Sequence, residues 1–141
     1  MPTFKITLEY DGTNYHGWQV QPNLPTIQGT LEAVISRVAQ HKANVTGAGR
    51  TDAGVHAMGQ VAHFSTTARL TAEEWQRALN GLLPPDIAVQ AVEDVPDSFH
   101  ARFSAKSKLY RYRIFARVNR SALSRSKILH YPYPLDLDAM E

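Results

Sequence analysis

The sequence of 141 residues contains no cysteine. This absence excludes a disulfide scaffold, catalysis by a thiol and a zinc site built on cysteine. The sequence also has no apolar run close to the about 20 residues that a membrane-spanning helix needs. Its first residues, Met1 to Lys5, lack the apolar stretch of a secretory signal. We therefore expect a soluble protein of the cytoplasm.

Acidic residues are missing from one long stretch of the chain, between Asp97 and Asp136. Residues 102–141 carry nine Lys and Arg against three Asp and Glu, a net charge of +6, whereas residues 1–101 carry six against ten, a net charge of −4. Three aromatic residues lie among the basic ones: Tyr110, Tyr112 and Phe115. This mixture is typical of a protein that binds a polyanion with stackable bases. A solvated strand face beside a basic loop would give the same composition.

The overall composition is that of an ordinary globular protein. Hydrophobic residues make up 43% and charged residues 20% of the chain, close to the average for globular domains. A length of 141 residues corresponds to one domain of about 100–200 residues. The composition excludes a disordered, collagen-like or coiled-coil chain.

Hydrophobic spacing predicts alternating strands and helices. Apolar and polar residues alternate over residues 3–10, which is typical of a half-buried strand. Thr26 is expected to cap a helix, and Thr71 with Glu74 forms a capping box, so helices should begin directly after Thr26 and Thr71. The predicted elements are a strand over 3–10, a helix over 27–40, a strand over 60–66, a helix from 72 that Pro84 stops, and strands over 87–95 and 109–117, with a further short strand near Val45.

The order of the main elements is β-α-β-α-β-β, and the strands are amphipathic. These features favour an α+β sandwich with the helices on one face of a mainly antiparallel sheet. A ferredoxin-like or RNA-recognition-type arrangement fits this order. The last residues, 136–141, look like the capped first turn of a helix, and a single helical turn has no reason to be stable. We therefore expect the chain to be a fragment of a longer protein.

The segment over residues 47–57 is the most informative for chemistry. Three glycines allow a ligand to approach the main chain closely, and one cation, Arg50, and one carboxylate, Asp52, lie among them. A carboxylate can act as a nucleophile, a base or a metal ligand. Arg50 can hold that carboxylate charged or meet a phosphate. The spacing matches neither the dinucleotide fingerprint nor the Walker pattern. From the residues alone, a tight turn in which Asp52 caps a backbone amide is slightly favoured.

Several motifs together resemble one family. The sequence GRTDAGVHA over residues 49–57, followed by QVAHF over 60–64, closely resembles the active-site segment of the TruA-type tRNA pseudouridine synthases. Further segments that resemble this family follow the same order along the chain: YDGT at 10–13, GWQ at 17–19, TIQGTLE at 26–32, Asn80, LPPDI at 83–87, FHARFSA at 99–105, YRY at 110–112, HYP at 130–132 and PLD at 134–136. The resemblance therefore runs from the first predicted strand to the end of the chain.

The resemblance implies an activity and the residues that carry it. Members of the family convert uridines in the anticodon stem-loop of tRNA to pseudouridine, without a cofactor, when an aspartate attacks the flipped-out nucleotide. Asp52 matches this nucleophile, and Arg50 matches the arginine that takes part in base flipping or contacts a phosphate. Tyr110 matches the tyrosine that stacks on the uracil. Tyr112, on the same face of the predicted strand, is expected to pack in the core.

The remaining site residues follow from charge. Four basic residues are expected to contact the RNA backbone: Arg102, Lys106, Lys108 and Arg111. His16 is a weaker candidate for the RNA path. No metal site is expected, because His56 and His63 have neither a cysteine nor a histidine partner four residues away.

The family also implies what lies outside this chain. Its members are roughly twice as long and contain two related α+β halves, so residues 1–141 match the N-terminal half that carries the catalytic aspartate, and the C-terminal half is absent. The intact proteins are usually homodimers that bind tRNA. Two alternatives are a non-catalytic RNA-binding module and an inactive truncated synthase, and a third is a nucleotide-binding enzyme that cradles phosphate in the glycine-rich loop.

Overall fold

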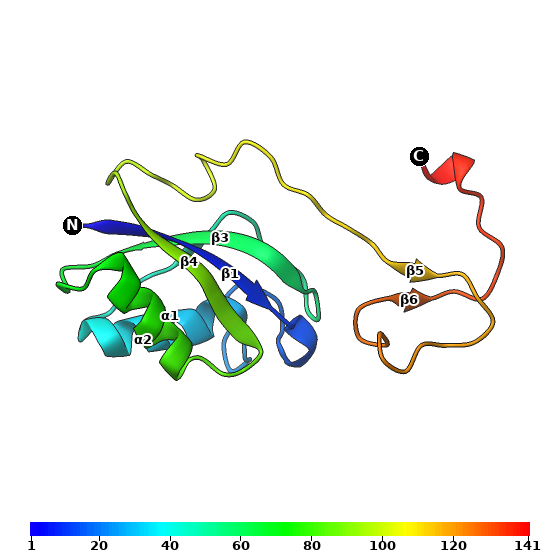
Figure 1. Cartoon of the computed structure of the whole chain (residues 1–141), viewed down its shortest axis with the longest axis horizontal. Helices are drawn as coiled ribbons and strands as arrows, with labels where there is room; N and C mark the ends of the chain where they lie inside the picture. Colours follow the sequence, from blue (N-terminus) through cyan, green and yellow to red (C-terminus); the bar gives the residue numbers. More distant parts are fainter. The chain divides into compact units, whose positions relative to one another are not determined.

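The computed structural model describes residues 1–141, which divide into two compact units, Met1–Lys106 and Ser107–Glu141. The first unit contains β1 (Thr3–Tyr10), the short helix η1 (Gly12–Asn14), α1 (Ile27–Ala39), β2 (Thr46–Gly47), β3 (Ala57–Ser65), α2 (Ala72–Leu82) and β4 (Ile87–Val95) (Figure 1). The second unit contains β5 (Ile114–Phe115), β6 (Leu129–His130) and η2 (Asp138–Met140).

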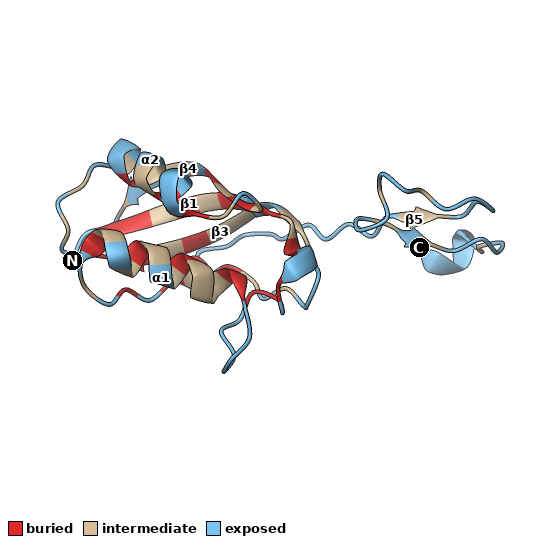
Figure 2. Ribbon diagram, turned by 90° about the horizontal axis from the view of Figure 1, so that it is seen from below, coloured by how far each residue is buried: buried red, intermediate tan, exposed pale blue.

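The first unit is a four-stranded sheet with the strand order β2-β3-β1-β4. Each neighbouring pair is antiparallel, and both helices cover the same face of the sheet (Figures 1 and 2). The short strand β2 supplies the element predicted near Val45, so the order becomes β-α-β-β-α-β, that of a ferredoxin-like fold. The predicted α+β class is therefore confirmed. Neither α1 nor α2 has the length and apolarity needed to cross a membrane.

The core lies between the helices and the sheet. Alternate residues of β1 point toward the helices, and Ile6 and Leu8 are completely buried there. Leu31 and Ile35 of α1 and Leu79 of α2 are also completely buried, which follows from the helical spacing of these residues. Aromatic rings complete the core near the start of β1, where the ring centroids of Phe64 and Trp75 lie 4.9 Å apart and those of Phe4 and Phe64 lie 5.7 Å apart. Burial of this apolar stripe holds the helices to the sheet.

Both predicted helix caps are confirmed. The Thr26 side chain accepts a hydrogen bond from the Gly29 N–H, and Thr71 and Glu74 form both hydrogen bonds of a capping box. The first helix ends at Ala39, because Gln40 adopts the left-handed conformation with φ of 59°. The strand predicted over 60–66 begins earlier than expected. It corresponds to β3, which starts at Ala57 rather than at residue 60, since Ala57 pairs with Tyr10.

The predicted strand over 109–117 is wrong. Only Ile114–Phe115 forms a strand, which pairs with Leu129–His130 in parallel. Alternating side chains do not make a strand unless a neighbouring strand pairs with its N–H and C=O groups. Residues 109–112 lie outside every ladder, and Arg113 contributes only its carbonyl, which accepts from the Leu129 N–H. Tyr112 was expected in the core but is 90% exposed. The predicted helical turn over 136–141 forms a single 3-10 turn at Asp138–Met140.

Residues 96–104, here called the strap, follow β4 and dock on β3. His63 of β3 lies opposite Lys5 in the strand register, so its side chain points to the sheet face away from the helices. The Ala101 N–H donates a hydrogen bond of 2.9 Å to His63 Nδ1, and the rings of His63 and His100 lie 4.9 Å apart. Ala101 is only 2% exposed. His63 therefore anchors the strap to the open face of the sheet.

We expect acid to weaken this anchor. Burial, and next the nearby His100, lower the pKa of His63 below its ordinary value. His63 therefore becomes protonated at a higher pH in the unfolded chain than in the folded chain. The free energy of unfolding falls as the pH is lowered from about 6.5 through the lowered pKa of His63. Urea unfolding across this range measures the loss. His63→Asn supplies an acceptor that does not titrate, so its stability should fall less over the same range; equal losses in the two proteins would contradict this role.

A second contact joins α2 to β4. Asn80 Nδ2 donates to the Val89 carbonyl oxygen at 2.9 Å, and Asn80 Oδ1 accepts from the Val89 N–H at 2.8 Å. Since Val89 is 3% exposed, Asn80→Ala leaves two main-chain groups without partners. We expect a loss of about 2 kcal/mol in the free energy of unfolding, measured by urea denaturation.

The matched control for Asn80 is Gln76→Ala, on the same helix. Gln76 donates one exposed hydrogen bond to the Gln90 carbonyl, so water can replace it, and the loss should be under about 0.5 kcal/mol. Similar losses for the two variants would show that the two hydrogen bonds at Val89 stabilise the fold no more than the exposed hydrogen bond of Gln76 does.

Candidate active site

The segment that carries Asp52 is a loop between β2 and β3. Asp52 is exposed, and the Val55 N–H donates to the Asp52 main-chain carbonyl at 3.1 Å. The loop turns at Gly54, whose φ is +81°. These contacts form a tight turn, but its hydrogen bond uses the main chain of Asp52 and leaves the carboxylate without a hydrogen bond. The prediction that the Asp52 side chain caps a backbone amide is therefore wrong.

A second segment, residues 15–18, holds this loop through its main chain. The Trp18 N–H donates to the Thr51 carbonyl at 3.0 Å, and the Gly54 N–H donates to the Tyr15 carbonyl at 3.2 Å. Gly17, with φ of +81°, packs so closely that an added Cβ would lie 2.5 Å from the Thr51 carbonyl oxygen. These contacts fix the main chain on both sides of Asp52.

The far end of the loop is held by the turn after β1. The Gly12 N–H donates to His56 Nδ1 at 2.9 Å, and Asp11 Oδ1 lies 3.2 Å from the same nitrogen. A side chain at Gly12 would collide with the Val55 carbonyl oxygen. His56 therefore has a structural place beside the loop.

Tyr15, whose carbonyl binds the Gly54 N–H, is itself held by a side-chain hydrogen bond. Its hydroxyl donates a hydrogen bond of 2.6 Å to Asp86 Oδ1. Burial raises the pKa of Tyr15 well above its ordinary value, and the hydrogen bond and the charge of Asp86 add to the shift. The phenol therefore stays protonated and keeps this bond at neutral pH.

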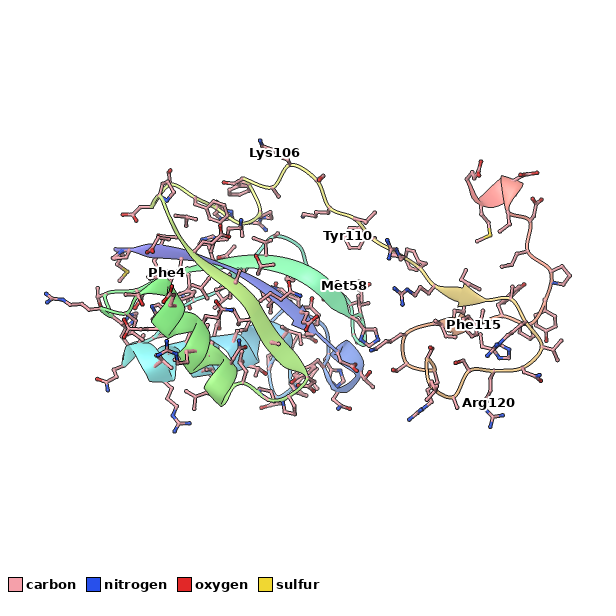
Figure 3. The ribbon with its side chains drawn as sticks, in the orientation of Figure 1. Phe4, Met58, Lys106, Tyr110, Phe115 and Arg120 are labelled. Atoms are coloured by element: carbon pink, nitrogen blue, oxygen red, sulfur yellow. The ribbon has the colours of Figure 1, made fainter.

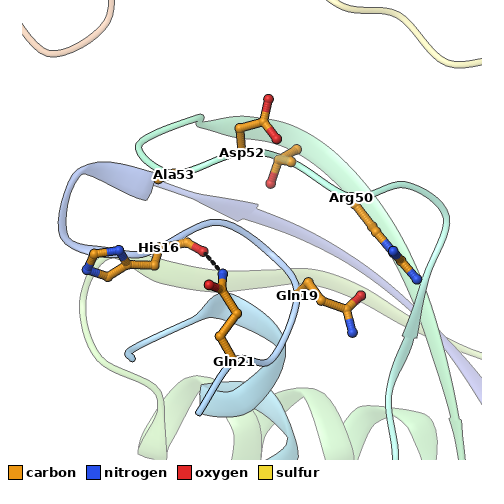
Figure 4. Close-up of a pocket in the computed structure, with 7 residues that line it drawn as sticks. His16, Gln19, Gln21, Arg50, Asp52 and Ala53 are labelled. Carbon is orange, nitrogen blue, oxygen red and sulfur yellow. Dashed lines mark hydrogen bonds between the residues drawn. The ribbon is translucent and has the colours of Figure 1, made fainter. Parts of the chain in front are cut away.

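A pocket of about 250 Å³ lies beside Asp52, formed by the loop and by residues that precede α1. The residues that line it are His16, Gln19, Gln21, Arg50, Thr51, Asp52 and Ala53 (Figure 4). Gln21 Nε2 donates to the His16 carbonyl at 2.8 Å, which ties together the two ends of the stretch 16–21 that precedes α1. The pocket is smaller than the about 300–1,000 Å³ of sites for drug-sized ligands.

Gln19 and Gln21 were not among the predicted site residues. Gln19 belongs to the GWQ segment that resembles the family, but no role was assigned to it, and Gln21 belongs to no motif. Both lie more than 25 positions before Arg50, so only the tertiary contact between the two segments brings them to Asp52. His16, a weaker candidate, does line the pocket.

Arg50 lines the same pocket but does not neutralise Asp52. No ion pair joins the two side chains, and Figure 4 shows the guanidinium directed away from the carboxylate. The alternative in which Arg50 holds Asp52 charged is therefore wrong in this structure. A phosphate contact by Arg50 stays a prediction, and its exposed guanidinium is accessible to one.

The other predicted residues lie outside the pocket lining. Arg102 and Lys106 belong to the first unit, and Lys108, Tyr110 and Arg111 belong to the second. All five are exposed, with Tyr110 at 60%. The four basic side chains form no salt bridge with a carboxylate, so their charges are available to an external anion.

The sequence is similar to those of known proteins. A sequence model of the tRNA pseudouridine synthase family matches residues 6–104. The tRNA pseudouridine synthase A of Geobacillus sp. is 51% identical over 137 residues, which are 96% of this chain and 55% of the relative. The proteins of the same name from Caldicellulosiruptor bescii and Rhodopseudomonas palustris are 45% and 51% identical, over 100% and 99% of this chain and 58% and 57% of their own lengths.

The chain thus spans little more than half the length of the relatives it matches. The matched region nevertheless includes the whole sheet apart from the first residues of β1, both helices and the loop that carries Asp52. The resemblance seen in the sequence is confirmed, and the chain belongs to the tRNA pseudouridine synthase family.

Proposed function

We propose that residues 1–141 are the aspartate-bearing half of a tRNA pseudouridine synthase that acts on uridines of the anticodon stem-loop. The observation that carries the proposal is an exposed carboxylate without a hydrogen-bond or ion-pair partner, held at the edge of a pocket by main-chain contacts on both sides. A nucleophile needs a free lone pair and a suitable position. The Asp52 carboxylate has free lone pairs, and the main chain that carries it is fixed on both sides.

The reaction is an isomerisation, so it needs no oxidant, reductant or second substrate. The bond between ribose C1′ and uracil N1 breaks, a bond between C1′ and C5 forms, and the hydrogen on C5 leaves as a proton while N1 gains one. Asp52 attacks the flipped-out nucleotide to start this exchange. The base must leave its stack before a carboxylate can reach it.

The other residues would serve substrate binding. Arg50 contacts a phosphate or fills the space that the flipped base leaves, and Tyr110 stacks on the uracil. Stacking of a base on an aromatic ring contributes about 1–3 kcal/mol. The gain would offset part of the cost of flipping.

The partner in this proposal is tRNA. Four exposed basic residues would contact its backbone: Arg102, Lys106, Lys108 and Arg111. Neutralising phosphates releases counterions, so binding should weaken as salt increases. By analogy with the family, the intact protein would be a homodimer in the cytoplasm.

The first prediction concerns Asp52. In a chimera that joins residues 1–141 to the uncovered part of the Geobacillus relative, tRNA labelled with tritium at uracil C5 should release tritium. Asp52→Asn should reduce the release to the level without enzyme, because the amide cannot act as the nucleophile. The same assay on the 141-residue chain alone measures whether this half suffices.

The control for Asp52→Asn is Asp94→Asn, the same change at an exposed carboxylate of β4, which should leave the release unchanged. A chimera that binds tRNA and releases no tritium would overturn the proposed reaction and favour the non-catalytic RNA-binding module. Full activity of Asp52→Asn would overturn the role of Asp52.

The second prediction concerns the position of the loop. Gly17→Ala should lower kcat by about 10²-fold, because a displacement of about 1 Å at the reacting group is enough for such a loss. Its Kd for tRNA should stay unchanged, since no RNA contact is removed. Steady-state kinetics of the chimera and a binding titration separate these effects.

Gly81→Ala is the matched control for Gly17→Ala. Nothing lies within 4 Å of an added Cβ at Gly81, and alanine favours the helix by up to about 1 kcal/mol, so activity should be kept. An unaltered kcat in Gly17→Ala would show that the contact with Thr51 does not position Asp52.

A further inference from the structure

The strap contains a turn whose hydrogen bonds are internal. His100 Nδ1 accepts from the main-chain N–H groups of Arg102 and Phe103, each at 3.2 Å. The Ser104 hydroxyl accepts from the His100 N–H at 3.1 Å, and the Ser104 N–H donates to the His100 carbonyl at 2.7 Å. The turn therefore has a defined conformation without help from other elements.

This turn is also fixed to the sheet. Ala101 is buried and donates to His63 Nδ1, and the ring of Phe99 lies edge-on to His63 with centroids 6.0 Å apart. The strap runs above the face of the sheet that the helices leave open (Figure 1). The side chains that the turn exposes are therefore held in place before any ligand binds.

The turn displays an aromatic ring to solvent. Phe103 is 75% exposed, although a well-formed turn on a folded sheet could hold a polar residue there at no cost in core packing. One contact of the ring is a stack on His100, with centroids 4.1 Å apart and an interplanar angle of 23°. The other is the Arg102 guanidinium, whose Cζ lies 4.9 Å from the ring centroid. An exposed aromatic ring beside a cation is the arrangement by which proteins bind single-stranded nucleic acid.

Charge favours RNA as the ligand of this ring. Lys106 follows the turn within the same unit, and no acidic residue occurs after Asp97 until Asp136. Asp97 itself lies 3.8 Å from the N-terminal amine, which offsets its charge. Figure 3 shows the Lys106 side chain directed away from the sheet. A phosphate next to a stacked base would therefore meet cations rather than carboxylates.

We propose that Phe103, with His100 and Arg102, is a stacking platform for an unpaired RNA base, separate from the pocket at Asp52. The inference rests on the proposed function for the identity of the ligand, but it assigns a second contact to the RNA. None of the three residues lines the Asp52 pocket. The platform would hold a nucleotide that flanks the reacting one and so set the register of the RNA on the sheet.

The test is RNA binding by the 141-residue chain carrying Asp52→Ala, so that no chemistry occurs. Fluorescence anisotropy with a labelled anticodon stem-loop and with a short oligouridine should give a Kd about tenfold higher for Phe103→Ala. The slope of log Kd against log salt should stay the same, because no charge is removed. The Phe103→Trp variant should have the same Kd as the chain with Phe103, and RNA binding should quench the fluorescence of the new indole.

Two controls separate stacking from other losses. Leu82→Ala removes a partly exposed apolar side chain from α2 and should leave the Kd unchanged. An oligomer of abasic ribose phosphate keeps the charge but has no base, and Phe103→Ala should bind it as well as the unsubstituted chain does. Thermal unfolding checks that Phe103→Ala is folded, as its exposure predicts.

The outcomes distinguish this inference from the proposed function. A Kd for Phe103→Ala within twofold of the parent, or no quenching in Phe103→Trp, would overturn the platform even if the chimera is active. A loss of affinity in Phe103→Ala together with an inactive chimera would support the platform and overturn the proposed reaction. No RNA binding by the chain would overturn the platform.

Discussion

The main-chain contacts between residues 15–18 and the loop at 51–54 are the constraint on which the candidate site depends. A glycine-rich loop loses much conformational freedom when it is fixed. These main-chain contacts offset that loss, together with one side-chain hydrogen bond of 2.9 Å between the Thr51 and Tyr10 hydroxyls. Trp18 links these contacts to the core: its N–H binds the Thr51 carbonyl, while its ring is 2% exposed and packs against Tyr10 and Gly47. The position of Asp52 therefore depends on the burial of Trp18 in the core formed by the sheet and α1.

In the proposed function, RNA binding and chemistry would use different physical means. The carboxylate lies in the part with net negative charge, so its position comes from hydrogen bonds and close packing rather than from a neighbouring cation. The basic residues that would bind RNA are exposed and concentrated after residue 101, where they act through long-range attraction. The strap joins these two regions, because His63 fixes its turn to β3 while Lys106 continues into the basic stretch.

The comparison of sequence and structure shows where local patterns are sufficient. Helix caps at Thr26 and Thr71 were predicted correctly because the side chain and the amide that it binds are three residues apart. The strand over 109–117 was predicted from an equally clear alternation and did not form, because a strand depends on a partner that is distant in sequence. The possibility that Arg50 pairs with Asp52 is not realised, since a separation of two residues in sequence does not fix the direction of a side chain.

The sequence by itself determined the α+β class, the helix boundaries near their caps, the glycine-rich loop with its one carboxylate and the family to which the chain belongs. These depend on spacing and residue type, which are local properties. Only the tertiary structure decided that Gln19 and Gln21 share a pocket with Asp52, that the Asp52 carboxylate makes no hydrogen bond, and that Phe103 is held exposed on the strap. Each of these depends on contacts between segments far apart in the chain, which form because burying the core of the first unit brings the segments together.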